Sequence, residues 1–145
     1  MAIATTSLVS CAMGSLDRDR VVFHSLQFGN DGTSVVTNVR VNYGGKVFPE
    51  GFAHHTYDPN HQMTFSESHA LPVPQVATVF WTSADGRDHK VEVPVGSLIE
   101  DAKRFAGFRF FFVDDHVDVY VRYKKPGWPK ILDVDIKKSY SSPRS

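Results

Sequence analysis

The clearest structural signal in the chain is 76-VATVFWTSADGRDHKVEV-93. Residues 76–82 and 88–93 are rich in β-branched and aromatic side chains that alternate with polar ones, the period-two pattern of a half-buried strand. The Asp85-Gly86 pair between these segments favours a tight reversal of the chain. The stretch therefore predicts an antiparallel β-hairpin.

The same pattern predicts further strands on both sides of this hairpin. They cover residues 21–28, 34–43, 46–48, 62–66, 108–113, 117–123 and 131–136. The segment 108–113 is apolar on both faces, as expected for a central strand. In 117–123, alternation places Asp118 and Arg122 on the solvent side.

A helical signal occurs once, near residues 96–105. Ser97 and Glu100 have the spacing of a capping box, and Gly107 suits the position after a helix end. Together with the strands, this predicts an all-β, mainly antiparallel fold: a sandwich or open barrel of about eight strands with one short helix.

Composition limits the class of protein. The chain has 145 residues, of which 41% are hydrophobic and 22% charged, so we expect one folded domain over residues 17–137. It has no run of about 18 apolar residues that could span a bilayer as a helix. Lys+Arg and Asp+Glu both number 16, which argues against nucleic-acid binding. Residues 138–145 read as a flexible basic tail.

The first 16 residues have their own pattern. Leu8-Val9-Ser10-Cys11 resembles the lipobox of bacterial lipoproteins, in which the peptide is cut before the cysteine and the cysteine is acylated. Residues 1–7 contain no Lys or Arg and are too short for a full signal, so residues 1–16 read as a truncated signal, lipobox and tether. The resemblance implies lipidation at Cys11 and a periplasmic protein anchored to a membrane by its lipid.

Candidate metal ligands gather in one segment. His54, His55, His61 and His69 are four of the seven histidines. Imidazole ligates zinc and copper, but adjacent histidines in an extended segment point to opposite faces, and no His-Glu-x-x-His or paired-cysteine motif occurs. We therefore predict solvated histidines and no metal site, and keep a metal-dependent enzyme as the least favoured alternative.

Other catalytic patterns are weak. Ser66 and His69 lie close in sequence, but triads are assembled in space, and there is no Gly-x-Ser-x-Gly elbow. Asp114 and Asp115 suit the start of a hairpin turn. We accordingly predict that the chain is not an enzyme and uses no cofactor.

The long irregular connection from Phe48 to His61 mixes aromatic, histidine, glycine and proline residues, as binding loops do. We expect it to contact a protein partner, together with the turn at 114–116. The predicted partner-binding residues are Phe52, His54, His55, Tyr57, Asp58, His61, Asp114, Asp115 and His116.

Several short segments resemble small proteobacterial lipoproteins. They are Val41-Asn42-Tyr43-Gly44-Gly45, Leu71-Pro72-Val73-Pro74, Val79-Phe80-Trp81, Asp85-Gly86 and Val91-Glu92-Val93. Some of these lipoproteins are periplasmic immunity proteins encoded beside toxins of type VI secretion systems. The resemblance implies binding to a secreted effector, such as a lipase or another cell-envelope toxin, and occlusion of its active site. A structural lipoprotein of the envelope or of a secretion system is the alternative.

Overall fold

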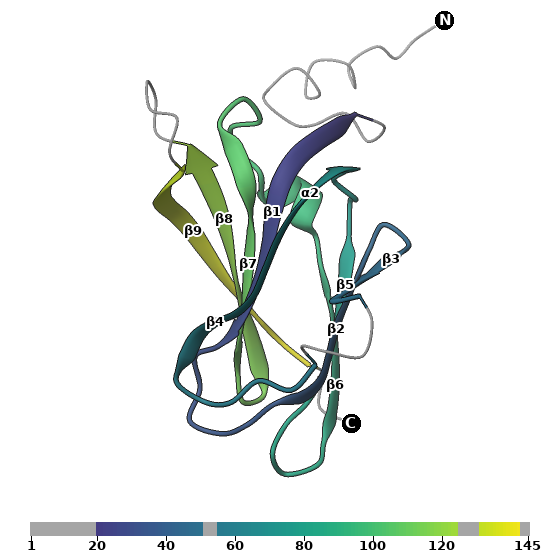
Figure 1. Ribbon diagram of the computed structural model, residues 1–145. Coiled ribbons are helices and arrows are strands. Elements are labelled where there is room, and N and C mark those ends of the chain that lie inside the picture. Colours follow the sequence, from purple (N-terminus) through teal and green to yellow (C-terminus); the bar gives the residue numbers. More distant parts are fainter. Residues whose placement is uncertain (1–19, 51–54, 125–130, 143–145) are drawn as a thin grey trace, which may run out of the picture.

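The computed structural model describes residues 20–50, 55–124 and 131–142 (Figure 1). Within these ranges, the elements in chain order are β1 (Val21–Asn30), β2 (Thr37–Tyr43), β3 (Lys46–Phe48), β4 (His61–Pro72), β5 (Ala77–Thr82), β6 (Asp88–Val93), α2 (Val95–Leu98), β7 (Phe105–Val113), β8 (His116–Lys124) and β9 (Ile131–Ser141). In this part of the chain, no helix is long and apolar enough to cross a bilayer.

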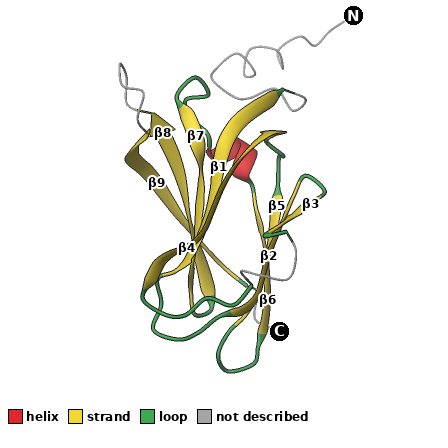
Figure 2. Ribbon diagram, in the orientation of Figure 1, coloured by secondary structure: helices red, strands yellow, loops and turns green. Residues whose placement is uncertain are grey.

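The strands form two sheets packed face to face (Figure 2). The five-stranded sheet has the order β4-β1-β7-β8-β9, and the four-stranded sheet has the order β3-β2-β5-β6. All pairings are antiparallel except that of β1 with β7. The predicted all-β, mainly antiparallel fold is confirmed, and of the two architectures left open the structure has the sandwich.

The core lies between the sheets and is built by alternation. Phe108, Phe110 and Phe112 point inward from β7 and are fully buried, as is Phe28 on the adjacent β1. From the other sheet, Trp81 on β5 contacts Phe112 with ring centroids 5.4 Å apart. The expected central position of residues 108–113 is confirmed, because β7 is the middle strand of its sheet.

One glycine makes the parallel pairing possible. Gly107 has φ +152° and pairs with Ser25, and a Cβ atom at this position would overlap the backbone and side chain of Ser25. The sequence pattern assigned Gly107 to the end of a helix, whereas it lies inside β7.

The helix is shorter than predicted. α2 has four residues and no side-chain cap: the Ser97 hydroxyl donates to the carbonyl of Pro94, and the backbone N–H of Glu100 donates to the Tyr123 hydroxyl. The expected capping box is therefore wrong, because both groups are already bonded to other partners.

Two strands exceed their predicted bounds by several residues at one end and change the description of the domain. β4 pairs with β1 from His61 to Pro72, where a short edge strand was expected over 62–66. β9 continues through Ser141 and pairs Tyr140 with Val117, so the domain extends past the expected boundary at residue 137.

The prediction that Asp118 and Arg122 face solvent is wrong. Their side chains point away from the core, yet Asp118 is 4% and Arg122 7% exposed. Ser139 on β9 donates a 2.5 Å hydrogen bond to Asp118, and Arg122 donates a 3.4 Å bond to Ser25 on β1. At these two positions the outer face of the sheet is therefore covered by cross-strand polar contacts.

Candidate functional site

The best-defined candidate surface is one end of the sandwich, where four connections meet. We call it the loop end, and it comprises residues 31–36, 55–60, 83–88 and 114–116. The β5–β6 and β7–β8 hairpins turn at this end, and the chain crosses here from β1 to β2 (Figure 1). Each connection follows a strand of the core, so the loops are held on a rigid scaffold.

Asn30, at the end of β1, joins two of these connections. Its side-chain NH2 group donates to the backbone carbonyls of Ser34 and Tyr57, both at 2.9 Å. Its side-chain oxygen, Oδ1, accepts from the backbone N–H of Gly32 at 2.9 Å. Asn30 is fully buried, so these bonds are sheltered from water. Asn30 therefore holds the β1–β2 loop and the 55–60 segment in one arrangement.

The surface contains an open hollow of about 470 Å³. Its lining residues come from three connections: Ser34, Ser83, Ala84, Asp85, Arg87, Asp114 and Asp115. Trp81 supports one side, because its indole N–H donates to the carbonyl of Asp114 at 2.8 Å and so ties the two sheets together. The hollow is thus a built feature with walls from both sheets.

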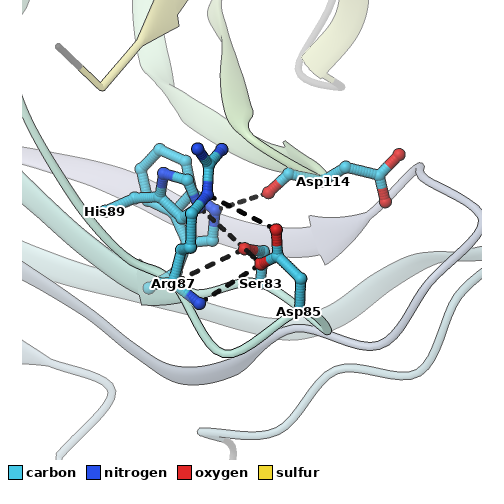
Figure 3. A network of polar contacts seen from close by, with 6 residues as sticks. Ser83, Asp85, Arg87, His89 and Asp114 are labelled. Carbon is cyan, nitrogen blue, oxygen red and sulfur yellow. Dashed lines mark hydrogen bonds and ion pairs between the residues drawn. The ribbon is translucent and has the colours of Figure 1, made fainter. Parts of the chain in front are cut away.

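A polar network occupies the wall formed by the β5–β6 turn (Figure 3). Ser83 Oγ lies 2.5 Å from Asp85 Oδ1 and 2.8 Å from His89 Nε2. Asp85 also accepts from the backbone N–H of Arg87 and pairs with its guanidinium at 3.4 Å. The hydrogen bond from Ser83 lowers the pKa of Asp85, so this carboxylate is ionised at neutral pH.

This network lacks the bonding of an activated nucleophile. The Ser83 hydroxyl donates to Asp85, so His89 donates its Nε2–H to Ser83 instead of accepting a proton. In a serine triad the carboxylate would bond to Nδ1 of the histidine, but Nδ1 of His89 has no hydrogen-bond partner among the described residues. The arrangement stabilises the turn and orients Asp85 and Arg87.

His89 itself is held inside the fold. It is 5% exposed and stacks on Trp81 with ring centroids 4.9 Å apart. Burial lowers the pKa of His89, with a further contribution from the charge of Arg87, so the ring is neutral at pH 7.

The loop end is strongly acidic. It contains six aspartates, and Arg87 is the one Lys or Arg in these segments. The aspartates are Asp31, Asp58, Asp85, Asp88, Asp114 and Asp115. Such a concentration of one sign gives a negative potential over the surface and attracts a partner with a basic face.

Several predicted partner-binding residues lie at this end. Asp58 and Asp115 are exposed, and Asp114 lines the hollow. His116 lies between two carboxylates, 3.6 Å from Asp115 and 3.5 Å from Asp118. The fold thus brings together the 55–60 segment and the 114–116 turn, which were expected to act jointly.

Tyr57 is a correction. It was predicted to contact a partner, but it is fully buried and packs edge-on against Phe112, with centroids 6.1 Å apart. Its backbone pairs with Val36, and this places the ring in the core. His55, also a predicted contact, bonds through Nδ1 to the carbonyl of Val39 at 2.7 Å and is partly buried.

The remaining predicted residues are outside what the structure describes. Cys11, Phe52 and His54 fall in undescribed segments. The side chain of His61 is also undescribed, although its backbone, at the start of β4, pairs with Asn30 of β1. Sequence reasoning missed Asn30, Ser83 and Arg87. The Ser-x-Asp-Gly pattern at 83–86 indicated the turn but not that it shares a hollow with Asp114, because Asp114 belongs to the other sheet.

The other candidates for chemistry lie apart from this end. Ser66 accepts a hydrogen bond from Gln27, and His69 pairs with Glu67 at 2.9 Å, so the two do not form a nucleophile–base pair. Among the described residues, no group of three or more His, Cys, Asp or Glu side chains is arranged to hold a metal ion.

Comparison with known proteins found no matching family model, no similar curated protein and no similar solved structure.

Proposed function

We propose that this chain is a periplasmic lipoprotein that binds a cognate secreted effector and neutralises it by occluding its active site. The observation that carries the proposal is the loop end, a rigid acidic surface with a hollow, built on a β-sandwich. The lipobox resemblance at Cys11 and the resemblance to immunity lipoproteins supply the compartment and the class of partner.

The size of the loop end suits an inhibitor. A standard inhibitor interface covers about 800 Å² on each partner. This is roughly a tenth of the accessible surface of 8537 Å², so the loops at one end of the domain are sufficient. Asn30 and Trp81 hold these loops in place before binding, and this reduces the entropy lost on association.

Charge defines the partner further. Asp58 and Asp115 are exposed at the rim, while Asp85 and Asp114 line the hollow. A partner that fits has basic residues around its active site, and long-range attraction speeds its capture. Effectors that act on envelope lipids fit this description, because basic residues near their active site would attract the lipid phosphates.

The proposal is tested by capture and inhibition. The full chain is used as bait in lysate of its source organism, and the captured protein is purified and assayed with and without the chain. We expect one stoichiometric toxin-like partner encoded by an adjacent gene, with its activity abolished by the chain. Capture of several envelope proteins and no inhibition would instead support the structural alternative.

Variants locate the interface. Reversal of two charges at the loop end, Asp58→Lys with Asp115→Lys, is expected to lower affinity about tenfold or more. Glu92→Lys is the matched control, because Glu92 is an exposed acid on β6 outside the loop end. Equal affinity of the double variant and the control would place the interface elsewhere.

A further inference from the structure

The exposed apolar residues of the domain gather at the end opposite the loop end. Among the described residues, the large hydrophobic side chains that are exposed are Val21 (59%), Phe23 (68%), Val47 (46%) and Val76 (44%). Val21 and Phe23 lie where β1 begins, Val47 follows the β2–β3 turn, and Val76 precedes β5. We call this the N-terminal end (Figure 1).

These side chains lie on the outer faces of both sheets, and we call the two sets the apolar rims of this end. His24, Leu26 and Phe28 face the core from β1, so alternation directs Val21 and Phe23 outward from the five-stranded sheet. The pairing of β7 with β1 begins at Ser25, so Phe23 has no paired residue on β7. By the same alternation, Val47 and Val76 point outward from the four-stranded sheet.

An apolar groove of about 530 Å³ lies at the same end. Its walls are the end of β4, the connection that follows it, and the β2–β3 turn, with Leu71, Val73 and Pro74 as apolar lining and Lys46 as the charged residue. Exposed apolar patches of this kind, next to a groove, mark surfaces that bind proteins or membranes.

The charge of the residues around the groove favours a membrane over a protein as the occupant. The exposed basic residues Arg20 and Lys46 stand beside the apolar rim, and Lys103, Arg104 and Lys124 lie at the same end. The acids at this end are Glu50, Glu92, Glu100 and Asp101, one fewer than the bases. Glu50 pairs with Lys46 and Asp101 with Arg104, and because both pairs are exposed to solvent they are weak. This end is thus mildly basic and apolar, whereas the loop end is acidic, so the domain has opposite character at its two ends.

We propose that the N-terminal end docks on the surface of an anionic phospholipid bilayer, with Phe23 and Val21 entering the headgroup region and Arg20 and Lys46 contacting lipid phosphates. The inference rests on the proposed lipidation at Cys11. Residues 12–19 join that position to Arg20, and the nine steps from Cys11 to Arg20, at about 3.5 Å each, reach at most about 32 Å. A lipid on Cys11 therefore keeps this end of the domain close to the membrane.

Docking has a consequence for function. The lipid on Cys11 holds the chain at the membrane, and a second contact through the N-terminal end fixes how the domain is oriented on it. With the N-terminal end on the bilayer, the acidic loop end is turned away from the anionic surface and toward an approaching effector.

The test uses the full chain with Cys11→Ser, so that no acyl group contributes. Binding is measured by sedimentation with vesicles of phosphatidylethanolamine and phosphatidylglycerol, and with vesicles of phosphatidylcholine. We expect preferential binding to the anionic vesicles that weakens with salt, and a loss of about fivefold or more for Phe23→Ser and for Lys46→Glu. Val47→Ser tests the other rim, and Asp58→Asn at the loop end is the control that should not weaken binding.

Equal binding to both kinds of vesicle, or binding unchanged in Phe23→Ser, Val47→Ser and Lys46→Glu, would overturn the inference. Unfolding of Phe23→Ser, detected by circular dichroism, would leave the decision to Val47→Ser and Lys46→Glu. Effector capture is measured separately on the same variants. Capture without vesicle binding refutes the docking surface alone, and vesicle binding without any effector refutes the proposed function alone.

Discussion

Removal of the Asn30 side chain tests whether one buried amide organises the loop end. Asn30→Ala deletes three hydrogen bonds of 2.9 Å, to Ser34, Tyr57 and Gly32. At about 1 kcal/mol for each buried bond, we expect the free energy of unfolding to fall by about 3 kcal/mol. This is a large part of the 5–15 kcal/mol typical of a domain.

Equilibrium unfolding in urea, followed by tryptophan fluorescence, measures this loss. Asn42→Ala is the matched control, because Asn42 accepts a single bond, from Gly45 in an exposed turn. The control should lose less than about 1 kcal/mol. The same loss in both variants would refute the assignment of Asn30 as an organising residue. If the loop end is the binding surface, Asn30→Ala should also weaken effector binding at temperatures where it remains folded.

Three further predictions concern the sandwich itself. Gly107→Ala should lower the free energy of unfolding by about 3 kcal/mol or more, because its Cβ would overlap Ser25 across the parallel pair. A melting temperature close to that of the wild type would contradict this. Burial lowers the pKa of His24 and His89, so the unfolded chain binds more protons below about pH 6.5 and stability should fall as pH drops from there. Urea midpoints at pH values above and below 6.5 check the sign, and a midpoint that rises on acidification would be inconsistent with buried neutral imidazoles. Trp81→Phe removes the bond to the β7–β8 turn and should cost about 1–2 kcal/mol by thermal denaturation, whereas an unchanged Tm would show that the bond does not brace the hollow.

On the outer face of the five-stranded sheet, the sequence pattern predicted the direction of a side chain but not its exposure to solvent. Alternation correctly directed Asp118 away from the core, and the predicted strand around it was right. Its burial came from Ser139 on β9, a strand that continues past the expected boundary. The period of a strand gives the direction of a side chain, but only the neighbouring strands decide whether water reaches it.

Tyr57 and the helix illustrate the same limit. An aromatic residue in a polar, proline-containing segment resembles an exposed contact, yet the pairing of Tyr57 with Val36 carries its ring onto Phe112. Ser97 and Glu100 have capping-box spacing, but Glu100 bonds to Tyr123 on a distant strand. In both places, contacts from remote parts of the chain overrode the local preference.

The sequence by itself determined the all-β class, the main strands and the tight hairpins, because alternation and turn residues act over a few neighbouring positions. It also determined the number of aspartates in the connections, but not that they share one surface. Only the tertiary structure decided the parallel pairing of β1 with β7, the role of Asn30, and the separation of an acidic end from an apolar, basic one. Those features depend on contacts between residues far apart in the chain, which no local pattern encodes.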